Sequence, residues 1–189
     1  MNLPSTAPRK TTEPLYSRIK AGEVHEHIIS ALVENRPGVL AHISGMFAAR
    51  GFNIASLAVG ETTDPTVSRL TVTCVGDVRV VEQIIKQLRK IIDVIRVVDM
   101  RERDHVEREL ILVKVRTTKE SRSEVMQIVD IFRSRIIDVH HDSVTVEQSG
   151  TQDKNDALVA LLQPFGVLEV ARTGRVALFR GPEHLKIPD

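Results

Sequence analysis

The chain has 189 residues, of which 42% are hydrophobic and 27% charged, a composition typical of a globular protein with an ordinary buried core. There are 26 Lys and Arg against 25 Asp and Glu, so the net charge of +1 gives no bulk attraction to nucleic acid or to an anionic membrane. Aromatic residues make up 3%, which leaves few rings for stacking on bases, and no apolar stretch is long enough to span a bilayer. The single cysteine, Cys74, excludes an internal disulfide and is expected to be a small core residue in a reducing compartment.

Residues 1–23 are rich in Pro, Thr and Ser and lack the apolar segment of a secretory signal. We predict a flexible tail there. Four basic residues leave a transit peptide open as the alternative.

Residues 24–100 follow the order β-α-β-β-α-β of a ferredoxin-like domain. A strand at 27–33 precedes an amphipathic helix that ends at Gly51, and an alternating strand lies around Leu70–Cys74. Between them, the apolar residues of a strand at 52–60 change face, which indicates either a bulge near Ala55-Ser56 or a strand buried on both sides. A second helix and a strand at 94–98 complete the unit. That helix has the clearest apolar stripe, formed by Val81, Ile84, Ile85, Leu88, Ile91 and Ile92.

The same plan is predicted to repeat at 109–181, after a charge-rich segment at 101–108 that is typical of a solvated linker. The expected elements are a strand at 110–115, a helix around 125–132, a hairpin of 136–139 and 144–147, a short helix at 153–162 and late strands at 167–171 and 176–179. Residues 182–189 would form a second tail. We therefore predict an α+β protein built from two ferredoxin-like βαββαβ domains.

The turn at Asn35–Leu40 is the most informative local feature. Pro37 suits the first position of a helix, and Gly38 lets a ligand approach the main chain. A helix N-terminus with unpaired N–H donors attracts a carboxylate or a phosphate. Because no catalytic side chain accompanies this turn, we predict a receptor for a small anion. The alternative is a helix start without a ligand, with Asn35 as a simple cap.

The strand at 52–60 would lie at an edge of a sheet with the order 4-1-3-2, and a long apolar edge needs a cover. Pairing of this strand between two chains would cover the edge and form an eight-stranded sheet. It would also bring Asn53 and Ile54 of one chain close to the Asn35–Leu40 turn of the other.

Other candidate sites are weaker. His25 and His27 share one face of a strand without a third zinc ligand, so exposed strand histidines are expected. His140, His141 and Asp142 alternate between faces and are not expected to bind a metal. Phosphate-binding loops and nucleophile motifs are absent from the sequence, so we predict neither catalytic residues nor metal ligands.

The segments Asn35–Leu40 and Arg50–Ile54 resemble those of an ACT domain, an amino-acid-sensing module of biosynthetic enzymes. Further segments resemble the small regulatory subunits of acetohydroxyacid synthase (acetolactate synthase), and the resemblance runs from about residue 24 to 181. These segments are Ser68–Thr71, Val106–Leu110, Phe132-Arg133, Ile136–Val139 and Glu169–Gly174.

This resemblance implies a non-catalytic protein that binds no cofactor itself, located in the cytoplasm, or in a plastid or mitochondrion of a eukaryote. It implies activation of a separate large catalytic subunit, which would carry thiamine diphosphate, FAD and magnesium, and feedback inhibition by valine in branched-chain amino acid synthesis. The chain is then expected to form a homodimer through its ACT domains, without a nucleic acid or membrane partner. The alternative is a free-standing ACT sensor that acts on another biosynthetic enzyme or regulator.

The same resemblance implies the effector contacts. Asn35 and Gly38 of one chain and Asn53 of its partner would bind valine, while Val39, Leu40 and Ile54 would supply amides or apolar walls. Pro37 stands at a position that varies in the family and should leave the amide donors of 38–40 intact.

Overall fold

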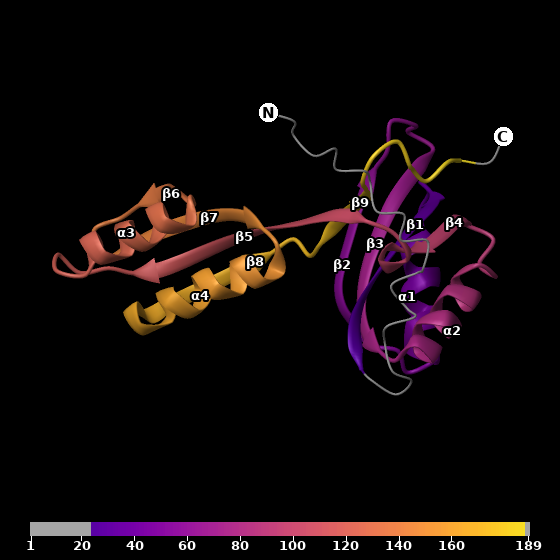
Figure 1. Ribbon diagram of the computed structural model, residues 1–189, viewed down its shortest axis with the longest axis horizontal. Helices are drawn as coiled ribbons and strands as arrows, with labels where there is room; N and C mark the ends of the chain where they lie inside the picture. The colour runs from indigo at the N-terminus through magenta and orange to yellow at the C-terminus, as the bar shows by residue number, and fades with distance from the viewer. Residues whose placement is uncertain (1–23, 188–189) are drawn as a thin grey trace, which may run out of the picture.

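The computed structural model describes residues 24–187, and the tail predicted at 1–23 lies outside the described residues. Two antiparallel sheets with helices against them make up the chain (Figure 1). The N-terminal sheet has the strand order β2-β3-β1-β4, which confirms the order predicted for a ferredoxin-like domain. Its elements are β1 (His25–Glu34), α1 (Val39–Ala49), β2 (Ile54–Glu61), β3 (Val67–Gly76), α2 (Val78–Leu88) and β4 (Val94–Asp99).

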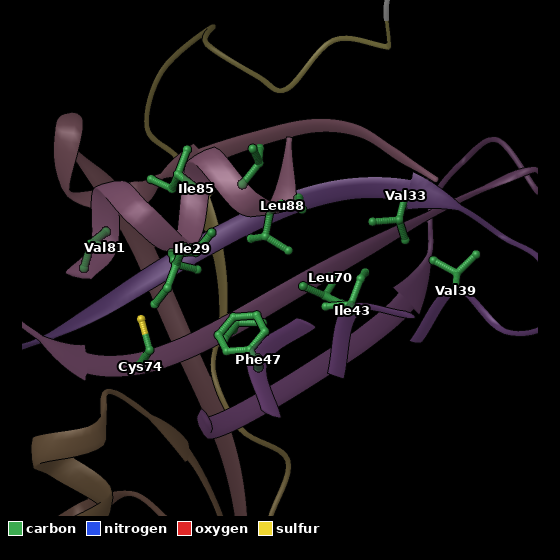
Figure 2. Close-up of a cluster of buried hydrophobic side chains, with 14 residues drawn as sticks. Ile29, Val33, Val39, Ile43, Phe47, Leu70, Cys74, Val81, Ile85 and Leu88 are labelled. Atoms are coloured by element: carbon green, nitrogen blue, oxygen red, sulfur yellow. The ribbon is translucent and has the colours of Figure 1, made fainter. Parts of the chain in front are cut away.

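The core of this half lies between the sheet and the two helices α1 and α2 (Figure 2). Alternate residues of β1 and β3 point toward the helices, as the period of a strand requires. Phe47 of α1 is almost fully buried and meets Phe52 edge to face, with 6.2 Å between the ring centroids. Cys74 is also buried in this cluster, so its expected role as a core residue is confirmed.

The structure tests two local predictions for this half. The bulge predicted near Ala55-Ser56 is confirmed, because the pairing of β2 with β3 shifts register between Ile54 and Ser56. The predicted apolar stripe of α2 is too long. The helix ends at Leu88, and Ile92 lies in the following turn with 87% of its surface exposed.

The C-terminal sheet has the order β6-β7-β5-β8 and repeats the same topology. Its elements are β5 (His105–Arg116), α3 (Arg122–Phe132), β6 (Arg135–Val139), β7 (Ser143–Gly150), α4 (Gln152–Gly166) and β8 (Val167–Arg172). The helix α4 is longer than the predicted 153–162 and ends at Gly166, which takes a positive φ of 93°. The fold class predicted from the sequence is confirmed in both halves.

The connection between the two halves differs from the expectation. After a short 3-10 turn, η2 (Met100–Glu102), the strand β5 already begins at His105, so half of the predicted 101–108 linker is strand. The first four residues of β5 pair with β9 (Val176–Phe179), and the rest of β5 forms the centre of the C-terminal sheet. One strand is therefore shared by both halves, as Figure 1 shows.

The late strand β9 does not complete the C-terminal sheet. Its Ala177 packs with Ile28 and Met100 against the face of the N-terminal sheet opposite α1 and α2. Leu185, expected in a tail at 182–189, is buried beside Leu32 and Val67 on the same face. No helix among residues 24–187 is both long and apolar enough to cross a membrane.

Candidate functional site

The turn between β1 and α1 is built around Gly38. Gly38 is the N-cap of α1 and takes φ +92° and ψ −21°, a left-handed conformation that favours glycine. A Cβ atom placed on Gly38 would meet nothing within 4 Å, so the main chain is open to the outside at this point. The prediction that Pro37 occupies the first helical position is wrong. Pro37 lies in the turn, and α1 begins at Val39 because the chain reverses through Gly38.

The first turn of α1 holds unpaired donors. The N–H of His42 donates to the Gly38 carbonyl at 3.0 Å, and the N–H of Val39 makes only a long bond of 3.5 Å to the Arg36 carbonyl. Within residues 24–187, the N–H groups of Gly38, Leu40 and Ala41 have no acceptor. No side chain caps this helix, and its first turn carries no acidic residue. These donors and the helix dipole together favour a bound anion.

Asn35 does not cap α1. Its Nδ2 donates to the Pro65 carbonyl at 2.9 Å and to Glu61 Oε1 at 3.1 Å, so the side chain connects the turn to the β2–β3 hairpin. The simple-cap interpretation is therefore wrong. The amide nitrogen is engaged with the protein itself, and the polar atom that remains for a ligand is the acceptor Oδ1.

Asp93, which the sequence analysis did not single out, fixes the geometry of this turn. Its buried carboxylate accepts a hydrogen bond from Arg36 Nε at 3.1 Å and lies 2.9 Å from His42 Nδ1. Its carbonyl accepts from the N–H of Glu34 at 2.9 Å. The hydrogen bonds from Arg36 and His42 hold the pKa of the Asp93 carboxyl below its usual value. Only the fold could reveal this residue, since 57 positions separate it from Arg36.

A hollow of about 140 Å³ lies beside the turn. Its polar wall comes from residues 34–36 and Ser68, and its apolar wall comes from side chains of all three strands β1, β2 and β3 and of α1. Leu40 and Val59 on this wall are each about half exposed, so the hollow is open on the side of β2. An unpaired helix N-terminus next to an open apolar hollow suits a small molecule that carries both a carboxylate and an apolar group.

The structure does not bring Asn53 and Ile54 to this hollow within one chain. Ile54 opens β2, whereas Glu61, which Asn35 contacts, ends it. At about 3.3 Å per residue, the two ends of β2 are roughly 20 Å apart. β2 is also an edge of the N-terminal sheet. If Asn53 and Ile54 take part in the site, they must come from a second copy.

The predictions for the histidines concern their exposure and their ability to bind a metal. His27 is fully buried with its Nδ1 3.5 Å from Asp99 Oδ2, so the prediction of an exposed histidine is wrong. His27 pairs with Cys74 across the sheet and therefore lies on the core-facing side of β1. His140 and Asp142 contact each other at 3.1 Å on the surface. In the part of the chain that the structure describes, no three His, Cys, Asp or Glu side chains group as metal ligands.

Both halves of the chain match families of known proteins. Residues 29–96 match the family described as AHAS small subunit-like ACT domain, and residues 108–181 match the family described as small subunit of acetolactate synthase. The acetolactate synthase small subunit of Aquifex aeolicus is 46% identical over 169 residues, covering 89% of this chain and 88% of that protein. A probable acetolactate synthase small subunit of Methanothermobacter thermautotrophicus is 52% identical over 160 residues, covering 84% and 95%. The crystal structure of the acetolactate synthase small subunit from Thermotoga maritima superposes with a TM-score of 0.77 at 42% identity, covering 84% of this chain and 99% of that one.

Proposed function

Because this chain belongs to the acetolactate synthase small-subunit family, we propose that it activates a separate catalytic subunit and makes it sensitive to feedback inhibition by valine. The chemistry and its thiamine diphosphate, FAD and magnesium would belong to that partner. This chain would contribute the sensor, and its ACT half would bind the effector. A cytoplasmic location and a homodimer joined through the ACT halves are parts of the same proposal.

The unpaired N–H groups at the start of α1 are the observation that supports a carboxylate ligand. The valine carboxylate would accept hydrogen bonds from Gly38 and Leu40, each charge-assisted bond contributing about 1.5–3 kcal/mol. Its ammonium group would donate to a side-chain amide oxygen, from Asn35 or from Asn53 of the partner subunit. The isopropyl group would fill the hollow. Relative to alanine it adds two carbons, about 1.6 kcal/mol or roughly fifteenfold in affinity.

Pairing of two β2 edges supports a site shared between chains. In an antiparallel pair whose twofold axis passes through the middle of the strand, the first residue of one strand lies opposite the last residue of the other. Ile54 of the partner subunit would then face Glu61 and the Asn35 turn of the first chain. The same pairing would cover the exposed edge.

Calorimetric titration of the purified chain with valine, and with alanine as the comparator, tests the ligand. We expect valine to bind about fifteenfold more tightly than alanine. Titration of the reconstituted holoenzyme with valine should show progressive inhibition, and omission of this chain should lower catalytic activity. Absence of binding by valine, leucine and isoleucine would overturn the proposal. Valine binding without any effect on the catalytic subunit would instead favour a free-standing sensor.

Mixing two inactive variants tests whether the site is shared. Asn35→Ala and Asn53→Ala should each abolish tight valine binding in a homodimer. In a mixed dimer, one of the two pockets combines an intact Asn35 with an intact Asn53, so binding should return to half of the sites. Unmixed samples of each variant are the matched controls. If mixing restores nothing while mixed dimers form, the two asparagines do not belong to one shared pocket.

A further inference from the structure

The segment between β8 and β9 crosses the N-terminal sheet at β2. Gly174, in the middle of this segment, takes φ +78°, and a Cβ atom placed on it would lie 3.2 Å from Ser56 Cβ and 3.3 Å from Ser56 Oγ. A side chain at position 174 would therefore press on Ser56, which would have to give way by a few tenths of an ångström. Ser56 itself is fixed to the sheet, because its Oγ donates to Oγ1 of the buried Thr73 at 2.9 Å. The C-terminal half therefore rests directly on β2.

Arg175, the next residue, also holds this segment against neighbouring strands. Its guanidinium is almost fully buried and forms ion pairs with Glu26 of β1 and with Glu107 of β5, the latter at 3.4 Å. Buried charges of this kind hold their partners firmly, since separation would leave a charge unpaired in a poorly solvated place. We call Ser56, Gly174, Arg175, Glu26 and Glu107 the interdomain contact.

The surroundings of the interdomain contact leave room for movement. A polar cavity of about 340 Å³ adjoins it, lined from one side by Ser56 and Leu57 and from the other by Glu109 and Arg172. The two halves thus touch at the interdomain contact without filling the space beside it. The apolar contacts that Ala177 and Leu185 make with the N-terminal sheet lie beyond Arg175 along the chain and outside this cavity.

The interdomain contact lies close to the proposed effector contacts along the chain. Asn53 and Ile54 are two to three residues before Ser56, and the β-bulge between Ile54 and Ser56 separates them. A bulge is a place where a strand can bend locally. A ligand that draws Asn53 and Ile54 toward a neighbouring chain would therefore act on Ser56 through this bulge.

We propose that the interdomain contact transmits the occupancy of the effector site to the C-terminal half, by changing the orientation of that half on β2. This inference rests on the proposed function, because it assumes that valine binds beside β2. A ligand can shift such an equilibrium only if it binds one orientation more tightly than the other. Disturbing the contact should then weaken inhibition while leaving the valine pocket itself intact.

Gly174→Ala tests the contact, and Gly181→Ala is its matched control. Gly181 has a similar positive φ of 73°, but a Cβ atom there meets nothing within 4 Å. Both variants place a non-glycine residue at a similar positive φ, and only Gly174→Ala pushes on Ser56. We expect Gly174→Ala to reduce the maximal inhibition by valine about twofold or more, with calorimetric affinity within about threefold of wild type. The double variant Ser56→Gly/Gly174→Ala removes the clashing atoms and should restore inhibition.

A distance measurement follows the orientation directly in the isolated chain. Spin labels on Ile92→Cys and Ile131→Cys would report from the two halves, since these side chains are 87% and 77% exposed. Cys74 is buried and should stay unlabelled. We expect valine to displace the distance distribution in the otherwise wild-type chain and in Gly181→Ala, and to leave it unchanged in Gly174→Ala.

The outcomes separate the two proposals. If valine does not bind the wild-type chain, the proposed function fails and the inference fails with it. If valine binds and inhibits but the distance distribution stays the same, the inference alone is overturned, even where Gly174→Ala folds poorly. Equal inhibition of Gly174→Ala and Gly181→Ala would also overturn it.

Discussion

Replacement of Gly38 by Asp places a negative charge where the effector carboxylate should bind. A Cβ atom at position 38 meets no other atom within 4 Å, so the new side chain fits without a clash. The positive φ of 92° costs a non-glycine residue about 1–2 kcal/mol. Gly38→Ala incurs the same strain without the charge and is the matched control. We expect both variants to fold and to differ in stability by less than about 1 kcal/mol, the usual size of a charge–dipole interaction.

The two variants should differ in valine binding. The carboxylate introduced by Gly38→Asp would compete for the N–H groups of Leu40 and Ala41 and repel the ligand. Loss of one charge-assisted hydrogen bond, about 1.5–3 kcal/mol, corresponds to a roughly 10- to 150-fold weaker affinity. Gly38→Ala keeps the amides and should lose much less. Calorimetry and valine titration of the reconstituted holoenzyme measure the effect, and activation should persist in both. Equal valine affinity in the two variants would refute the placement of the carboxylate at this helix start.

Three further predictions concern the scaffold around the site. Hydrogen bonds from Arg36 and His42 lower the pKa of Asp93, so the stabilisation they give is present above the unfolded value of 3.8 and is lost as the pH falls through the lower folded pKa. Urea midpoints measured from pH 6 downward should therefore fall less steeply in Asp93→Asn than in wild type, and parallel profiles would contradict this. Burial raises the pKa of the Cys74 thiol to about 11, so an aromatic disulfide reagent at pH 8 should modify it only after unfolding. Phe47→Ala should lower the free energy of unfolding by about 3–5 kcal/mol in a denaturant titration, and a loss below about 1 kcal/mol would contradict its placement in the core.

Local patterns predicted most of the fold, because the hydrophobic pattern within a short stretch of sequence indicates most of the helices and strands. The stripe of α2 and the alternation of β3 depend only on neighbours along the chain. The first residues of β5 are different. The segment His105–Arg108 contains a single apolar residue, and it becomes a strand by pairing with β9, about 70 residues later. No periodicity inside a charged segment can indicate a partner so far away.

The candidate site, like the fold, was only partly predictable from the sequence. The Pro-Gly turn was visible in the sequence, since glycine and proline mark a reversal wherever they stand. Asp93, the residue that holds the turn, was not visible in the sequence, because it meets Arg36 only after β4 has docked beside β1. The burial of His27 was missed for a related reason. Its face of β1 is set by the register with Cys74 and not by its own polarity.

The two halves share a topology, yet their first helices begin with different turns and different charges. In the C-terminal half, the connection from β5 to α3 uses Thr118 and Ser121 in place of a Pro-Gly pair. The Thr118 N–H donates to Ser121 Oγ at 2.9 Å, and the Ser121 N–H donates to Thr118 Oγ1 at 3.2 Å. Glu124 adds a negative charge to the first turn of α3, whereas α1 has none there. The N–H groups of Thr118 and Ser121 are thus engaged just before the helix, and an anion at the first turn of α3 would meet a like charge. Calorimetry should therefore give one valine per chain, and a second equivalent site per chain would show that the charge of Glu124 and the Thr118–Ser121 turn do not decide where the effector binds.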